Sequence, residues 1–104
     1  MSLNALQFRF TKMTALLIQY ADLLGYTLTY GDAYSKVDYG AHSYNSYHYK
    51  RLAVDFNLFI SGEYQTTTEA HKKLGKFWKM LDSKNRWGGD FKNNSDGNHY
   101  ETTI

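Results

Sequence analysis

Cysteine is absent from this sequence of 104 residues, so a disulfide bond and a thiolate metal site are both excluded. Any metal bound by the chain must therefore use histidine and carboxylate ligands. No run of about 18 apolar residues occurs, so we expect no membrane span. The formal net charge of +2 is too small to indicate nucleic acid as a partner. Residues 1–10 lack the basic and apolar segments of a secretory signal, so we expect a protein that is cytoplasmic when made.

The composition is that of an ordinary globular protein, with 42% hydrophobic and 21% charged residues. A chain of this length suffices for one hydrophobic core, so we expect a single domain over residues 1–104.

Apolar periodicity predicts two helices. Residues 4–24 carry one buried stripe at steps of three and four residues, and Gly25 then suits a left-handed cap. A second helix is expected from Thr67 or Thr68 to about Asp82, with a similar apolar face.

The segments between and after these helices predict strands. Residues 26–30 are β-branched and aromatic, and the apolar run of residues 52–60 is the most strand-like segment of the chain. Ser61-Gly62 then indicates a hairpin that returns through residues 63–66. Residues 31–47 are expected to form a long loop, residues 85–87 lead out of the second helix, and residues 99–101 form a last short strand. This order predicts an α+β fold with an antiparallel sheet.

Two histidines and an aspartate indicate where chemistry could occur. His48 and Asp55 lie seven positions apart, and on one continuous strand they would face opposite sides of a sheet. Both can reach one ion if the chain turns between them, at residues 49–51. Asp55 lies in an apolar run, where an unpaired carboxylate is costly, so a metal or a basic side chain should face it. His99 follows the turn pair Asp96-Gly97, which lets Asp96 fold back towards whatever His99 binds.

Two interpretations of these residues remain open at this point. In one, His48, Asp55 and His99 are the three protein ligands of a catalytic zinc ion, which leaves one open position. In the other, the histidines are ordinary and Asp55 caps the end of a strand. We expect neither remaining histidine to be a ligand: His42 is surplus to three ligands, and His71 should be solvated beside two lysines.

The combined motifs distinguish the two interpretations. Ser46-x-His48, Ala53-x-Asp55, Trp87-Gly-Gly and Asp96-x-x-His99-Tyr-Glu together resemble the M15 family of zinc peptidases over about residues 25–101. The resemblance implies a small antiparallel sheet flanked by helices, as in the Hedgehog-like DD-peptidases. It also implies Zn²⁺ bound by His48, Asp55 and His99, and Asp96 as general base.

By the same resemblance, Ser46 lies in the substrate pocket and Trp87 lies beside it, and both are expected to contact the substrate. Many members carry an arginine that stabilises the oxyanion where this chain has Ser35. Either Arg51 or Lys36 supplies that charge or turnover is weak, and we expect Arg51 to contact the substrate.

The resemblance implies a zinc-dependent hydrolase of the peptidoglycan stem peptide. The favoured activity is that of a phage endolysin, an L-alanyl-D-glutamate endopeptidase that acts on the cell wall after release, as a monomer. The alternatives are a D-Ala-D-Ala carboxypeptidase and a zinc-stabilised wall-binding or virion structural domain that has lost activity.

Overall fold

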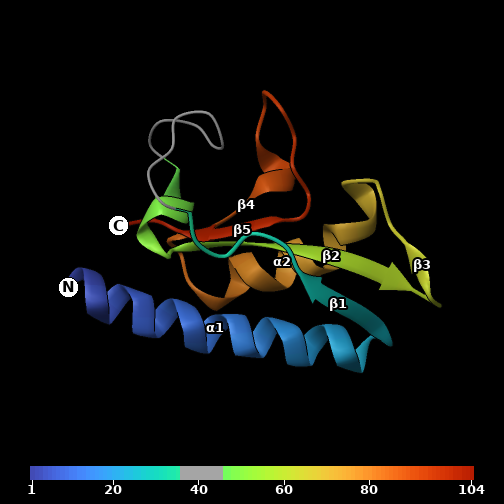
Figure 1. The fold of residues 1–104 in the computed structure, drawn as a ribbon, viewed down its shortest axis with the longest axis horizontal. Helices are drawn as coiled ribbons and strands as arrows, with labels where there is room; N and C mark the ends of the chain where they lie inside the picture. The colour runs from blue at the N-terminus through green and yellow to red at the C-terminus, as the bar shows by residue number, and fades with distance from the viewer. Residues whose placement is uncertain (36–45) are drawn as a thin grey trace.

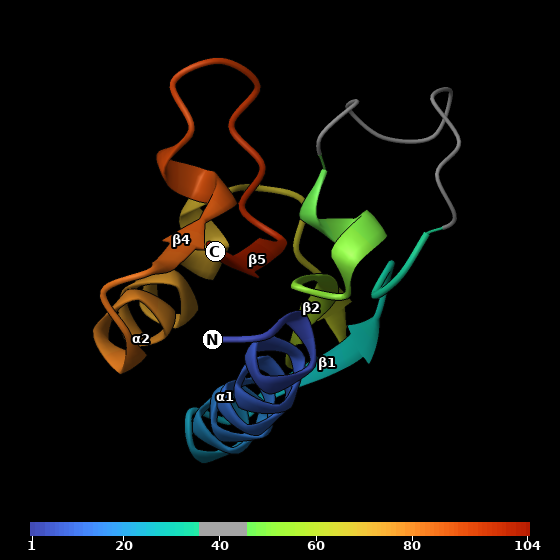
Figure 2. The ribbon, with the colours of Figure 1, turned by 90° about the vertical axis from the view of Figure 1, so that its left-hand side faces the viewer.

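An antiparallel sheet forms the middle of the fold in the computed structural model, which describes residues 1–35 and 46–104. Within these residues the sheet has five strands in the order β1-β2-β5-β4, and β3 pairs with β2. The strands are β1 (Tyr26–Tyr30), β2 (Ala53–Ile60), β3 (Glu63–Tyr64), β4 (Asn85–Trp87) and β5 (His99–Thr102). Figures 1 and 2 show both α-helices on one side of this sheet and the loop between β4 and β5 on the other. The α+β prediction is confirmed.

The first helix, α1 (Leu3–Leu23), agrees with the prediction to within one residue at each end. The Ser2 hydroxyl oxygen accepts a hydrogen bond from the backbone N–H of Ala5 at 3.1 Å, which satisfies one of the free donors of the first turn. Gly25 follows the helix with a φ of 78°, the left-handed conformation expected of it. The helix buries one apolar stripe, formed by Leu6, Phe10, Met13, Leu17 and Ala21.

The second helix begins later than expected. A 3₁₀ turn, η2 (Glu69–His71), precedes α2 (Lys72–Leu81), and the Thr67 hydroxyl accepts from the N–H of Ala70 at 3.3 Å. Trp78 of α2 is fully buried and meets Phe10 of α1 edge to face at 5.6 Å between ring centroids. Both helices thereby pack together beneath the sheet.

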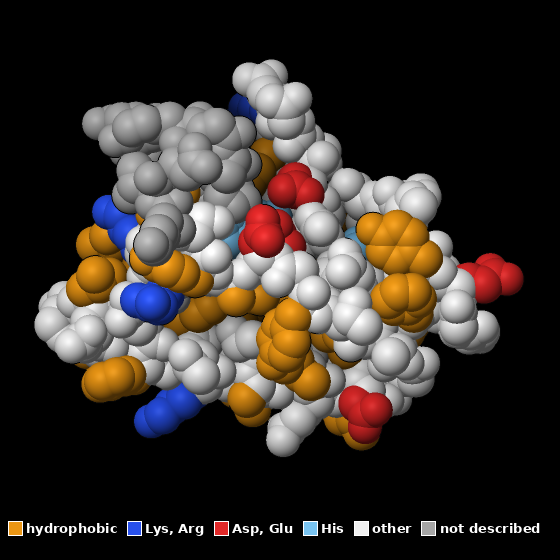
Figure 3. Space-filling model, in the orientation of Figure 1, with side chains coloured by type: hydrophobic (Ala, Val, Ile, Leu, Met, Phe, Trp, Pro, Cys, Tyr) orange, Lys and Arg blue, Asp and Glu red, His pale blue; other side chains and the backbone are white. Residues whose placement is uncertain are grey.

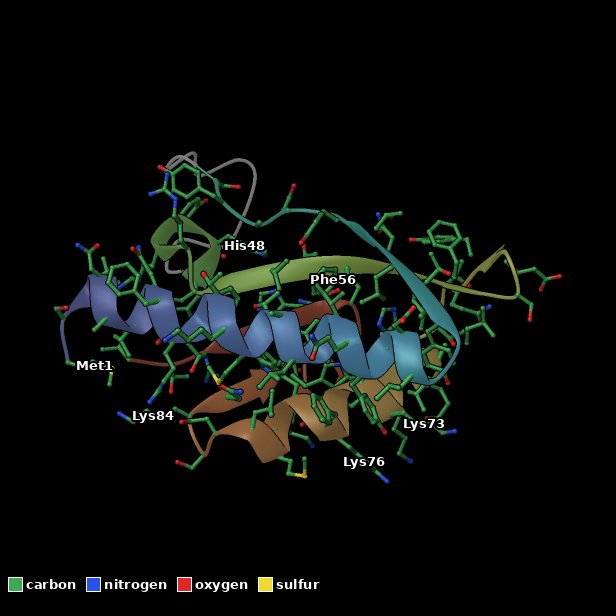
Figure 4. The ribbon with its side chains drawn as sticks, turned by 90° about the horizontal axis from the view of Figure 1, so that it is seen from below. Met1, His48, Phe56, Lys73, Lys76 and Lys84 are labelled. Atoms are coloured by element: carbon green, nitrogen blue, oxygen red, sulfur yellow. The ribbon has the colours of Figure 1, made fainter. Side chains whose placement is uncertain are left out.

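The alternation of side chains along β2 separates the core from the site. Val54, Phe56 and Leu58 are buried on the helix side, whereas Asp55 and Asn57 point to the other face and are half-buried. Figure 4 looks from the helix side, where α1 lies across the strand that carries Phe56. The side chains of Asp55 and Asn57 therefore point away from the hydrophobic core.

Three local predictions need correction or confirmation. The hairpin is confirmed, because Ser61 and Gly62 both have positive φ and Ile60 pairs with Glu63. Its second strand ends at Tyr64 rather than at residue 66. Residues 85–87, expected to be a connection, form β4, because they pair with β5 along its free edge.

The prediction that His71 is solvated is wrong. Its side chain turns inward from η2, is only 3% exposed, and places Nδ1 3.0 Å from the hydroxyl oxygen of Tyr100. The neighbouring Lys72 and Lys73 are exposed, so the charges beside His71 in sequence do not share its surroundings. Figure 4 shows Lys73 and Lys76 pointing outward from α2. No helix within the described ranges is long and apolar enough to cross a membrane.

Candidate metal centre

Three segments bring His48, Asp55 and His99 together on the loop side of the sheet. His48 lies in the 3₁₀ turn η1 (Tyr47–Lys50), which ends at Arg51 with a left-handed φ of 55°. The turn expected at residues 49–51 is therefore present, and it directs His48 to the same face as Asp55. His99 of β5 is the direct cross-strand partner of Asp55, so their side chains share that face.

The donor atoms of these residues converge. Oδ1 of Asp55 lies 3.2 Å from Nε2 of His48 and 3.0 Å from Nδ1 of His99, and the candidate ligand atoms all lie within 4.8 Å of one another. Both histidines are buried, at 2% and 7% exposure. Two imidazole nitrogens and one carboxylate oxygen are a donor set that suits zinc, with room for a fourth ligand. The residues present therefore fit the metal that the sequence predicted.

The second nitrogen of His99 is held by a carboxylate. Its Nε2 lies 2.7 Å from Oε1 of Glu101, and Nε of Arg86 donates to Oε2 of Glu101 at 2.9 Å. A histidine that donates one ring N–H to a carboxylate keeps the lone pair of its other nitrogen for a metal. Glu101 therefore orients His99 so that Nδ1 faces Asp55.

Burial and hydrogen bonding act in opposite directions on the pKa values here. Burial raises the pKa of Asp55, but hydrogen bonds from His48 and His99 outweigh burial and lower it to about 2. Burial lowers the pKa of His99, but Asp55 and Glu101 raise it to about 9. The pKa of Glu101 is lowered, because its bonds to His99 and Arg86 outweigh its burial. Asp55 and Glu101 are consequently ionised at neutral pH.

Asp96 differs from these carboxylates. It lines a cavity of about 440 Å³ together with His48, Asp55 and His99. Partial burial and the charge of Asp55 raise the pKa of Asp96, so it holds a proton more readily than an ordinary aspartate. In the view of Figure 3, acidic side chains lie beside histidine side chains in the middle of the molecular surface.

The backbone around Asp96 is tightly fixed. Its N–H donates to the carbonyl of Gly88 at 2.9 Å, and its own carbonyl accepts from the N–H of His99 at 3.1 Å. A Cβ atom at Gly88 would lie 2.0 Å from the Asp96 carbonyl oxygen and 2.8 Å from Cβ of His99. The Trp-Gly-Gly motif therefore provides the space in which Asp96 and His99 approach each other.

Ser46 lies at the cavity wall, and its contact with substrate stays a prediction. Its hydroxyl oxygen accepts a hydrogen bond from the backbone N–H of His48 at 3.2 Å, which caps η1. Ser46 thus also fixes the turn that presents His48.

Trp87 and Arg51 do not join the cavity. Trp87 pairs with Tyr100 across the strands and so faces the helix side, where it is 5% exposed and its ring packs against Gly75 of α2. Its indole N–H donates to the carbonyl of Gly97 at 2.7 Å, which ties down the loop of Asp96. The expectation that Trp87 contacts substrate is corrected to this positioning role.

Arg51 is exposed and stacks on Tyr34, with its guanidinium carbon 3.9 Å from the ring centroid. It lies outside the described residues that line the cavity, and its contact with substrate stays a prediction. Lys36 and His42 fall outside the described residues.

Sequence reasoning missed Arg86 as a cavity residue. The place of Glu101 in the cavity could have been predicted from the sequence, because a residue two positions after His99 on a strand faces the same side of the sheet. Arg86 gave no such signal, since β4 was not expected to be a strand.

Comparison with known proteins places the chain in a family. Residues 39–102, more than half of the chain, match the M15 peptidase model described as D-alanyl-D-alanine carboxypeptidase. The protein belongs to the M15 family of peptidases, as the resemblance indicated.

A solved structure shares the fold. The Serratia marcescens L-Ala D-Glu endopeptidase ChiX superposes with a TM-score of 0.72 at 17% identity, over 91% of this chain and 78% of that one. No curated protein matches the sequence.

Proposed function

We propose that this chain is a zinc-dependent peptidase that cleaves the peptidoglycan stem peptide, as an L-alanyl-D-glutamate endopeptidase of a phage endolysin. The observation that carries the proposal is the convergence of His48, Asp55 and His99 beside Asp96 on one cavity. Membership of the M15 family supports peptidase chemistry. The likeness to an L-Ala D-Glu endopeptidase supports the choice of bond. Residues 1–104 form one catalytic domain in this proposal.

His48, Asp55 and His99 would hold the metal. Zinc in such a site supplies an activated water near neutral pH and polarises the scissile carbonyl. Glu101 keeps His99 in the orientation in which Nδ1 is a ligand. All three side chains are at least partly buried and are carried by η1, β2 and β5, which favours a preorganised ligand geometry.

Asp96 carries the proton in this mechanism. Its carboxylate accepts a proton from the attacking water and then donates it to the leaving amine. A raised pKa suits both steps, because the group must first take up the proton and then release it. The hydrogen bonds of its backbone to Gly88 and His99 fix the carboxylate at the cavity.

A second candidate is D-Ala-D-Ala carboxypeptidase activity. The description of the matching family model favours it. Both activities would use the same residues and differ in the bond presented to Asp96.

Digestion of purified peptidoglycan, followed by mass spectrometry of the products, tests the proposal. Cleavage between L-Ala and D-Glu is expected, whereas release of terminal D-Ala would establish the second candidate. The absence of products from zinc-loaded protein would contradict both and leave a wall-binding or structural role.

Asp96→Asn should lower turnover by about a hundredfold or more while zinc content stays unchanged. Asp22→Asn is the matched control, since Asp22 is exposed on α1 across the sheet from the site. Wild-type turnover in the Asp96 variant would show that another group is the base.

A further inference from the structure

Arg86 occupies a distinctive place in the cavity wall. Among the described residues that line the cavity it is the sole lysine or arginine, and it stands with three carboxylates, Asp55, Asp96 and Glu101. Its side chain is 54% exposed, so the guanidinium is open to the cavity rather than enclosed by protein.

The guanidinium is held in position from several sides. Nε and Nη2 both donate to the same oxygen of Glu101, at 2.9 and 2.5 Å. The rings of Tyr47 and Phe91 flank it, with centroids 5.8 and 6.0 Å from the guanidinium carbon. Arg86 is therefore both exposed and fixed, which is unusual for a long side chain at a surface.

These contacts leave hydrogen-bonding capacity unused. A guanidinium has five N–H donors, and within the described part of the chain only two of them meet an acceptor. Nη1 has no described partner. The free N–H groups of a planar fork match the two oxygens of a carboxylate, which is the anion that arginine binds with two parallel hydrogen bonds.

We propose that Arg86 binds a carboxylate of the substrate and makes the protein selective for peptides with a free carboxylate beside the scissile bond. This inference rests on the proposed peptidase function and names a feature of its substrate. The cavity wall carries three carboxylates, and Arg86 is the described lysine or arginine side chain there that can pair with an anionic group of the substrate.

Glu101 links this anchor to the metal centre. One carboxylate oxygen contacts Arg86 and the other contacts His99, so a single side chain sets the distance between the two. A substrate carboxylate bound to Arg86 is thereby placed at a defined position relative to His99. The anchor selects the substrate and also orients it.

The test compares two peptides that contain L-Ala-D-Glu and differ only in whether the carboxyl group beside the scissile bond is free or is a carboxamide. Wild-type protein should cleave the acid with a kcat/KM about tenfold to a hundredfold higher, the range for hydrogen bonds to charged groups. Arg86→Gln should reduce this preference to within about twofold, mainly through KM. Arg86→Lys should retain part of it, because the charge remains.

Two controls accompany this comparison. Lys84→Gln removes the same charge from the exposed residue two positions before Arg86, and it should leave the preference unchanged. Zinc content should also stay the same in Arg86→Gln, which shows that the loss concerns the substrate and not the metal.

A binding measurement on metal-free protein separates this inference from the proposed function. By calorimetry, metal-free wild type should bind the acid peptide more tightly than the amide, and Arg86→Gln should bind both alike. If no peptide is cleaved but this binding difference appears, the peptidase proposal fails and the role of Arg86 stands. Cleavage of both peptides by wild type with equal kcat/KM, equal binding of the two peptides by metal-free wild type, or a preference unchanged in Arg86→Gln would overturn the inference.

Discussion

The buried histidine outside the site, His71, should make the fold sensitive to mild acid. Burial lowers its pKa to about 4, whereas an unfolded histidine has a pKa of about 6.5. Burial also raises the pKa of Tyr100, so the tyrosine hydroxyl keeps its proton, and its oxygen lies 3.0 Å from Nδ1 of the neutral imidazole, within hydrogen-bonding distance. The contribution of His71 to stability is therefore fully present above pH 6.5 and is lost as the pH falls towards 4.

The size of the effect follows from these two pKa values. Between pH 7 and pH 4.5 the unfolded chain takes up a proton that folded His71 largely refuses, which costs about 2 kcal/mol of unfolding free energy. That is a considerable share of the ~5–15 kcal/mol by which domains are stable. It corresponds to a fall in Tm of roughly 10 °C for a domain of this size.

Urea unfolding of chelator-treated protein at pH 7 and pH 4.5 measures the loss. His71→Gln is the comparison, because glutamine keeps a hydrogen-bonding group beside Tyr100 but does not titrate. Subtracting the pH dependence of the variant from that of wild type removes the contributions of His99 and the carboxylates. If wild type and His71→Gln lose the same free energy over this range, the assignment to His71 is refuted.

Three further predictions concern the site. Glu101→Gln should weaken zinc affinity about 10- to 100-fold, measured with a competing chelator, because His99 loses its orienting carboxylate. Gly88→Ala should lower both thermal stability and turnover, since the added Cβ would lie 2.0 Å from the Asp96 carbonyl oxygen; unchanged values would disprove this crowding. Metal-free protein should lose about 3 kcal/mol of stability as the pH rises from 6.5 through 9, because folded His99 has its pKa raised to about 9 and stabilises the fold only while protonated. Saturating zinc should abolish that alkaline loss.

The elements that the sequence predicts best are those whose patterns are local. The apolar stripe of α1, the apolar run of β2 and the Ser61-Gly62 turn each depend on neighbouring residues, and all three are present. The turn between His48 and Asp55 was also predictable, because two residues at an odd spacing cannot share a face of one strand.

What the sequence could not predict depends on contacts between distant segments. The three residues of β4 become a strand only by pairing with β5. That pairing also puts Trp87 on the core side and Arg86 on the cavity side. His71 looked solvated beside two lysines, yet the 3₁₀ turn directs it inward to Tyr100. Side-chain direction in such short segments is set by tertiary packing rather than by local propensity.

The central claim is that His48, Asp55 and His99 form one zinc site, and calorimetric titration of metal-free protein with zinc tests it most directly. Wild type and the exposed control Asp22→Asn should each bind one zinc ion, whereas His48→Ala, Asp55→Ala and His99→Ala should each lose that binding while remaining folded by circular dichroism. A wild-type protein that takes up no zinc, or an Asp55→Ala protein that binds it as tightly as wild type, would contradict the claim.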